Sequence, residues 1–135
     1  MKIFIQAFVF VAIILFSTAW AAKEASTPVY TQKTPYIHVS ASDPQFTVTL
    51  ISNPTTGYSW FLKNPHPDLE LIRHHFQTAS QTTLIGAPGS ELWVFKVRAK
   101  AFATAPLKIP LQLIYVRPWE KARPAETVVF WITTP

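Results

Sequence analysis

Short apolar runs separated by prolines and other turn residues constrain the fold of this sequence more than any other feature. The 135-residue chain contains 12 prolines and only 3 glycines, and every proline lies after residue 21. Proline disrupts helix interiors, and no run reaches the roughly 10–12 residues of 3.6-residue periodicity that an amphipathic helix needs. The sequence therefore favours short strands joined by shaped loops.

Seven segments have the alternation or the composition of strands. In the clearest of them, Phe46, Val48 and Leu50 face one way and the intervening polar residues face the other. Residues 69–76 could form a strand or a helix, and the alternation there favours the strand. Together these segments predict an all-β fold, an immunoglobulin-like antiparallel β-sandwich with Trp60 buried on its third strand. The segments are 36–39, 45–51, 58–62, 69–76, 91–99, 107–116 and 127–133.

The N-terminal residues have the pattern of an export signal. Lys2 precedes a run over residues 3–16 that is apolar apart from Gln6, and small residues follow it up to Ala21. An uncleaved anchor is the alternative, but the run is shorter than the roughly 20 residues that span a bilayer. We predict a signal peptide over 1–21, cleaved after residue 21 or 22, a flexible lead-in over 22–35, and one domain over 36–135. The protein would then be periplasmic or secreted, without a stable membrane anchor.

The composition excludes several classes of protein. The chain has no Cys, which rules out a disulfide scaffold, a thiolate zinc site and a cysteine nucleophile. Three glycines cannot supply a dinucleotide fingerprint or a phosphate-cradling loop, and neither motif occurs. No nucleophile motif such as Gly-x-Ser-x-Gly is present. We therefore predict no enzymatic activity, no catalytic residues and no cofactor.

The histidines and basic residues do not form a recognisable site. His74 and His75 are adjacent, so on a strand they would point to opposite faces and would rarely bind one metal ion. Lys96, Arg98 and Lys100 alternate onto one face of a strand, which favours a solvated sheet face over nucleic-acid binding. The net charge is +5, and it would be +4 after loss of Lys2 with the signal. We predict neither a metal site nor a nucleic-acid partner.

The segment between the second and third predicted strands is unusually restricted. Asn53 can start a turn by bonding its side chain to the backbone two residues on, and Pro54 fixes its own φ. Thr55 and Thr56 are stiff at χ1, and Gly57 can adopt a positive φ. An ordinary hairpin connection is the alternative, but it would need fewer residues. The sequence predicts a pre-ordered protrusion tipped by small hydroxyls.

Two further loops are expected at the same end of the sandwich. Arg117-Pro118-Trp119 follows the sixth predicted strand, and residues 82–90 precede the fifth. Trp119 is either an exposed aromatic anchor, a residue type enriched at binding hot spots, or a lid folded back on the sandwich. The three loops join the second to the third, the fourth to the fifth and the sixth to the seventh strand. In this topology all three loops can emerge at the same end of the sandwich.

These loops resemble the three signature loops of the chagasin family, which are protein inhibitors of papain-like cysteine proteases. The motifs are Asn-Pro-Thr-Thr-Gly-Tyr-Ser-Trp at 53–60, Gly-Ala-Pro-Gly at 86–89 and Tyr-Val-Arg-Pro-Trp at 115–119. Their order and spacing match from about residue 36 to the C-terminus. The second motif departs from the family's Gly-x-Gly-Gly pattern, because Pro88 stands at its third position and has no N–H for a main-chain contact.

The resemblance implies that the three loops bind a protease. The first would enter the cleft over the catalytic Cys–His pair, with Thr55 and Thr56 at its tip. The second would run along the non-primed side, and the third would place Trp119 on aromatic surface of the primed side. The implied protease-binding residues are Asn53, Pro54, Thr55, Thr56, Gly57, Tyr58, Leu84, Gly86, Ala87, Pro88, Gly89, Ser90, Arg117, Pro118 and Trp119, with Trp60 as structural support.

The resemblance therefore predicts a tight, reversible, non-covalent inhibitor of papain and cathepsin L-type enzymes, acting as a monomer. A secreted carbohydrate-binding module is the alternative from another class, since such sandwiches also display exposed tryptophans. That module would need two or three coplanar aromatic rings, whereas the loop end of this sequence offers one. A third possibility is an adhesion or envelope domain without inhibitory activity.

Overall fold

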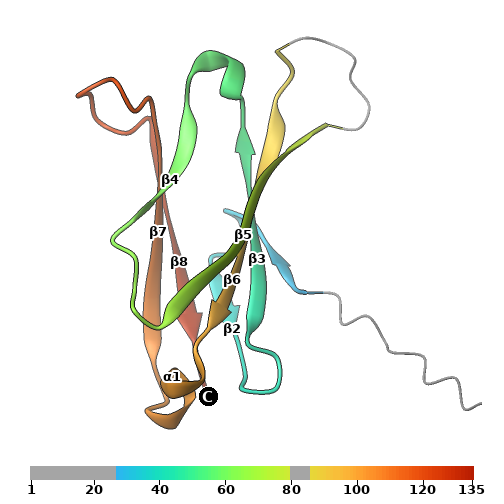
Figure 1. Ribbon diagram of the computed structural model, residues 1–135, viewed down its shortest axis with the longest axis vertical. Coiled ribbons are helices and arrows are strands. Elements are labelled where there is room, and N and C mark those ends of the chain that lie inside the picture. Colours follow the sequence, from blue (N-terminus) through green and yellow to red (C-terminus); the bar gives the residue numbers. More distant parts are fainter. Residues whose placement is uncertain (1–26, 80–85) are drawn as a thin grey trace, which may run out of the picture.

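The computed structural model describes residues 27–79 and 86–135, so the predicted signal peptide lies outside the described residues. Within those ranges the chain forms two four-stranded sheets (Figure 1). Sheet A has the order β1-β3-β6-β5, and sheet B has the order β2-β8-β7-β4. The strands are β1 (Val29–Tyr30), β2 (Tyr36–His38), β3 (Gln45–Ser52), β4 (Ser59–Lys63), β5 (Leu69–Thr78), β6 (Gly89–Val97), β7 (Lys108–Val116) and β8 (Glu126–Thr133).

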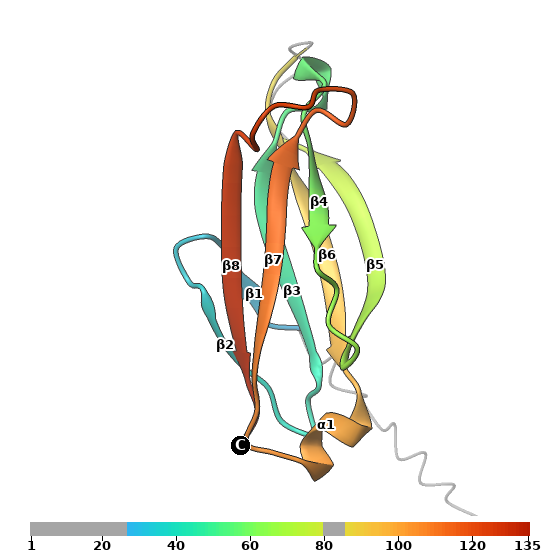
Figure 2. The same ribbon diagram turned by 90° about the vertical axis from the view of Figure 1, so that its left-hand side faces the viewer.

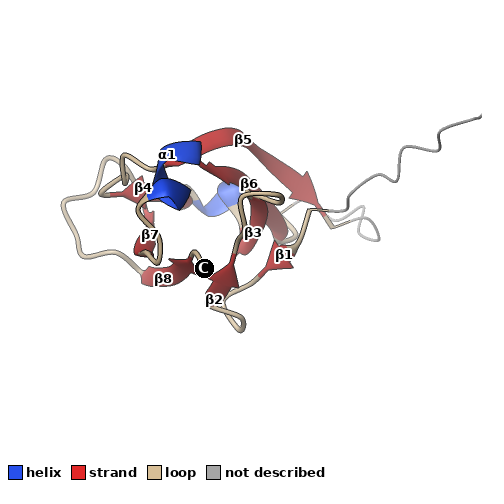
Figure 3. Ribbon diagram, turned by 90° about the horizontal axis from the view of Figure 1, so that it is seen from below, coloured by secondary structure: helices blue, strands red, loops and turns tan. Residues whose placement is uncertain are grey.

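A single apolar core fills the space between the sheets. Along β6, buried and half-buried residues alternate over the whole strand, as expected when one face of a sheet packs inward. Phe46 of β3 and Phe95 of β6 stack with ring centroids 5.7 Å apart. Seen along the strands, the two sheets lie as separate layers (Figure 3). The predicted β-sandwich is therefore confirmed, and each of the seven predicted segments contains a strand, including 69–76. The fifth segment was predicted too long at its end, because β6 ends at Val97 and α1 begins at Ala99.

The N-terminal part of the described chain differs from the expectation. Residues 22–35 were expected to be a flexible lead-in, but Val29–Tyr30 forms β1 and pairs with β3. Two residues are too few for a periodic pattern, so the sequence does not reveal this strand. The β1–β3 and β2–β8 pairings are parallel, which departs from a wholly antiparallel sandwich.

Two short helical segments were also not predicted. They are α1 (Ala99–Ala103), after β6, and the 3-10 turn η1 (Pro54–Thr56), between β3 and β4. Neither is long enough to show helical periodicity in the sequence. No helix in the described part of the chain has the length and apolar character of a transmembrane span.

The three loops of interest emerge at one end of the sandwich, as predicted. Figure 2 shows the β3–β4 and β7–β8 connections together at the end opposite α1 and the C-terminus. β5 ends and β6 begins at the same end, and the β3–β4 connection lies between the start of β6 and the β7–β8 connection (Figure 1). The alternation of up and down strands therefore brings together segments far apart in the sequence.

Candidate functional site

The β3–β4 connection, residues 53–58, is a compact turn that we call loop 1. The Thr56 N–H donates to the Asn53 carbonyl at 3.1 Å, and the Gly57 N–H donates to the Pro54 carbonyl at 2.9 Å. Pro54 occupies the first turn of η1, where its missing N–H costs nothing. Gly57 ends the turn in the left-handed region, with φ of 83°. Proline and glycine thus define the two ends of the turn.

The threonine hydroxyls of loop 1 bond inward. The Thr55 hydroxyl donates to Asn53 Oδ1, and the Thr56 hydroxyl donates to the Asn53 carbonyl, both at 2.6 Å. Asn53 makes no side-chain capping bond to a backbone N–H of the turn, so the expectation that it would bond the backbone two residues on is wrong. Its Oδ1 instead accepts from the Thr55 side chain. The hydroxyls hold the turn together, and Pro54, Thr55 and Thr56 remain exposed.

Asn53 also connects loop 1 to residues 86–88, the described part of the β5–β6 connection next to β6, which we call loop 2. Its Nδ2 donates to the Gly86 carbonyl at 3.0 Å. Gly86, at φ of 87°, and Pro88 are exposed and Ala87 is half-buried, while Leu84 lies outside the described residues.

The other two residues predicted in loop 2 belong to β6. Gly89 is buried in register with Ser52, and a Cβ added to it would clash with the ring of Phe76. Ser90 is half-buried on the strand. Because Gly89 is enclosed by neighbouring strands, its role is close packing at the base of loop 2.

Arg117 connects loop 1 to the β7–β8 connection, which we call loop 3 (residues 117–125). Its Nε donates to the Thr56 carbonyl at 3.0 Å, and its guanidinium lies 4.5 Å above the centre of the Tyr58 ring. Its Nη1 forms an ion pair with Glu120 Oε1 at 2.8 Å. That hydrogen bond raises the pKa of the Arg117 guanidinium, which keeps its charge.

Trp119 is exposed at the loop end and also contacts loop 1. Its side chain is 69% exposed, which excludes a core position. A Cβ added to Gly57 would lie 2.7 Å from two atoms of the indole ring. The ring therefore lies directly against the Gly57 backbone, so Trp119 of loop 3 covers Gly57 of loop 1.

Stacked aromatic rings support loop 1 from below. The centroid of the Tyr115 ring lies 5.2 Å from that of Tyr58 and 5.0 Å from that of Trp60. The Tyr115 hydroxyl accepts a hydrogen bond from the Asn53 N–H at 2.9 Å. Trp60 is 2% exposed, and its indole N–H donates to the Ile51 carbonyl at 2.9 Å. From the sequence, Tyr115 was named only as the first residue of the 115–119 motif and was given no role in supporting loop 1.

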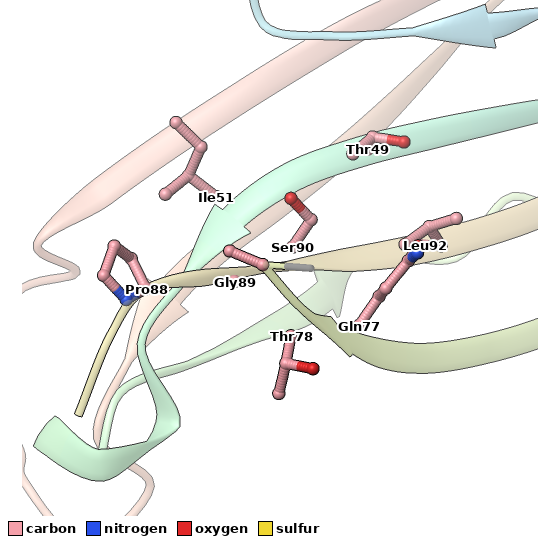
Figure 4. Close-up of a pocket in the computed structure, with 9 residues that line it drawn as sticks. Thr49, Ile51, Gln77, Thr78, Pro88, Gly89, Ser90 and Leu92 are labelled. Atoms are coloured by element: carbon pink, nitrogen blue, oxygen red, sulfur yellow. The ribbon is translucent and has the colours of Figure 1, made fainter. Parts of the chain in front are cut away.

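A shallow depression of about 490 Å³ lies beside the base of loop 2. Figure 4 shows its residues where β3, β5 and β6 approach the loop end. None of the described residues that line it is charged; they are Thr49, Ile51, Gln77, Thr78, Ala79, Pro88, Gly89, Ser90 and Leu92. Over the described ranges, no three His, Asp or Glu residues gather as potential metal ligands.

Gly57→Ala should disturb loop 1 in two ways. A left-handed alanine costs about 1–2 kcal/mol, and the new methyl group must displace the Trp119 ring. Gly86→Ala is the matched control, because its φ is also positive but, among the described residues, a Cβ there would meet only the Thr55 hydroxyl, at 3.8 Å. The indole N–H resonance of Trp119 should shift strongly in Gly57→Ala and little in Gly86→Ala. Equal shifts would show that the ring does not rest on Gly57.

Comparison with known proteins identifies the family. Residues 40–133 match the chagasin family of peptidase inhibitors, I42. The chain belongs to this family. No curated protein matches the sequence.

Two solved structures share the fold of this chagasin-family chain. The crystal structure of the cysteine protease inhibitor EhICP2 from Entamoeba histolytica superposes with a TM-score of 0.66, at 22% identity, over 81% of this chain and 96% of that chain. The solution structure of amebosin superposes with a TM-score of 0.51, at 19% identity, over 80% and 95% of the two chains. At these identities the likeness establishes the β-sandwich, and the family match carries the assignment to peptidase inhibitors.

Proposed function

We propose that this protein is a tight, reversible, non-covalent inhibitor of papain-like cysteine proteases and that its three loops plug the active-site cleft. Family membership and the likeness to a cysteine protease inhibitor support the class of target. The observation that carries the loop mechanism is the pair of bridges from loop 1, to Gly86 on one side and from Arg117 on the other. These bridges make three separate connections into one continuous edge.

The order of the loops along this edge suggests their roles. Loop 1 is central and its tip is exposed, so it would enter the cleft over the catalytic Cys–His pair. Loop 2 would lie on the non-primed side, where Pro88 has no N–H to contribute, and Trp119 would anchor loop 3 on the primed side. Because its internal bonds already fix loop 1, docking would cost little conformational entropy.

The chemistry of the edge favours a non-covalent mechanism. Loop 1 has no thiol, and both of its threonine hydroxyls are engaged in bonds to Asn53. The protein would thus act as an inhibitor without catalytic residues or a cofactor. With the export signal expected at the N-terminus, we also propose that a monomer acts in the periplasm or outside the cell.

Titration of papain and a cathepsin L-type enzyme with residues 22–135 should give complete inhibition at about stoichiometric amounts. Activity should return after dilution at the rate of dissociation, because no covalent bond forms. Trypsin should be unaffected and serves as the control. Lack of inhibition of several papain-like enzymes at micromolar concentration would contradict the proposal. Retention on insoluble polysaccharide without inhibition would favour the carbohydrate-binding alternative.

A further inference from the structure

A buried carboxylate lies beneath loop 1, in the apolar interior of the sandwich. Glu91 is the third residue of β6, points inward and is 3% exposed. Burial of a carboxylate is costly unless hydrogen bonds compensate for the lost hydration. The proposed contact with a protease does not use Glu91, so its position needs another explanation.

Three donors surround the Glu91 carboxylate, and each comes from a different strand. Oε1 accepts from the Ser52 hydroxyl of β3 at 2.6 Å and from the Trp60 N–H of β4 at 3.3 Å. Oε2 lies 2.8 Å from Nε2 of His74 on β5. When the carboxylate is ionised it can only accept, and the imidazole then donates from Nε2. The His74 ring is itself held by stacking on Trp93, with centroids 3.8 Å apart.

The positions of two of these donors are informative. Ser52 is the last residue of β3 and directly precedes loop 1, and Trp60 is the second residue of β4, just after it. β3 belongs to sheet A, whereas β4 is an edge strand of sheet B. One oxygen atom of Glu91 therefore joins the two ends of loop 1 across the gap between the sheets.

We propose that Glu91 is a positioning residue that sets the separation of the two ends of loop 1 and so the shape of the inhibitory edge. A shared acceptor fixes the two donors relative to each other, because both must point at the same atom. The His74 contact fixes the carboxylate in turn. The effect on loop shape stands on the geometry alone, whereas the effect on inhibition rests on the proposed function.

Two substitutions at this position separate positioning from simple packing. Glu91→Leu preserves bulk but leaves the Ser52 hydroxyl and the Trp60 N–H without an acceptor. In Glu91→Gln the remaining oxygen can accept both bonds, and the new amide can donate to a neutral His74. With the variants folded, Glu91→Leu should weaken papain inhibition by about tenfold or more, and Glu91→Gln by less than about threefold.

Ile109→Ala is the matched control for loss of stability. Ile109 is 1% exposed and lies near the start of β7, at the opposite end of the sandwich from the loops. This variant should be destabilised yet inhibit papain like the parent below its unfolding transition. Equal losses of inhibition in Ile109→Ala and Glu91→Leu, or parent-like inhibition by folded Glu91→Leu, would overturn the proposal.

Hydrogen exchange supplies a readout that needs no protease. The Trp60 amide should exchange at least about tenfold faster in Glu91→Leu than in Glu91→Gln, because only the glutamine retains its acceptor. Unchanged exchange would overturn the positioning role even if papain is inhibited. If papain is not inhibited by the parent, the proposed function fails while this measurement still tests Glu91.

A milder variant covers the case in which Glu91→Leu does not fold. Ser52→Ala removes the hydroxyl donor next to loop 1 and leaves the carboxylate, with its His74 contact, in place. It should fold and weaken papain inhibition by about threefold or more, with shifted amide resonances over residues 53–58. Parent-like inhibition and unshifted resonances would overturn the proposal.

Discussion

Trp60→Ala should lower the free energy of unfolding by about 3–5 kcal/mol, the usual cost of truncating a fully buried tryptophan. The ring is 2% exposed, so its removal leaves a cavity between the sheets. The substitution also leaves the Ile51 carbonyl without the indole N–H that now reaches it at 2.9 Å. Domains of this size are stable by about 5–15 kcal/mol, so this one change could remove a large part of the total.

Urea unfolding of the parent and the variant measures this loss, and Trp131→Ala is the matched control. Trp131 is only half-buried, on the outer face of sheet B, where Lys108 lies 4.4 Å from its ring centre. Its removal leaves no enclosed cavity, so the loss should be clearly smaller. If Trp60→Ala were as stable as the parent, the ring could not be part of the core.

Loss of Trp60 should also affect the loop end. Tyr115 rests on the Trp60 ring and accepts the hydrogen bond of the Asn53 N–H. Without the indole, the tyrosine loses its support, and the first residue of loop 1 becomes less constrained. Inhibition by the folded fraction of Trp60→Ala should therefore be weaker than that of the parent, in addition to the loss of stability.

The fold could be predicted largely from the sequence because its signal is local. Alternation such as that of Phe46, Val48 and Leu50 records which face of a strand is buried, and burial patterns repeat every second residue. β1 and α1 could not be found in this way, since two and five residues are too few for a period. Parallel pairing of the edge strands depends on the path of the chain, which composition does not encode.

The candidate site could be predicted as a set of loops but not as a set of contacts. Because successive strands run in alternating directions, the three connections are expected at one end of the sandwich, and the structure confirms this for their described residues. The bridges from Asn53 to Gly86 and from Arg117 to Thr56 join residues 33 and 61 positions apart. A periodic pattern in the sequence cannot predict contacts between residues so far apart in the chain. The inward turn of the threonine hydroxyls depends on the conformation of Asn53, which propensity did not predict.

Glu91 and the supporting role of Tyr115 were missed in the sequence analysis. Glu91 sits at an inward position of an alternating strand, where a charged residue breaks the apolar pattern. Such a break is itself a signal, because a buried carboxylate requires donors nearby. The identity of those donors, on three other strands, became visible only in three dimensions.

The contacts of loop 3 define the most direct test of the proposal that the three loops bind a protease. Trp119 is 69% exposed, and its ring lies against Gly57 of loop 1. A residue with so little burial contributes little to folding, whereas an exposed tryptophan beside an ordered loop is typical of a binding hot spot. The same side chain should therefore matter much more for protease binding than for stability.

Trp119→Ala is expected to weaken binding to papain by at least about 2 kcal/mol while leaving the unfolding free energy within about 0.5 kcal/mol of the parent. The loss should appear mainly in the dissociation rate, as is usual within one interface. Tyr36→Ala is the matched control, since Tyr36 is 63% exposed on β2, away from the loops, and its removal should change neither quantity. Surface plasmon resonance beside urea unfolding measures both. A loss of several kcal/mol in stability with unchanged inhibition by the folded fraction would make Trp119 a lid on the sandwich, and the inhibitory edge would then rest on loop 1.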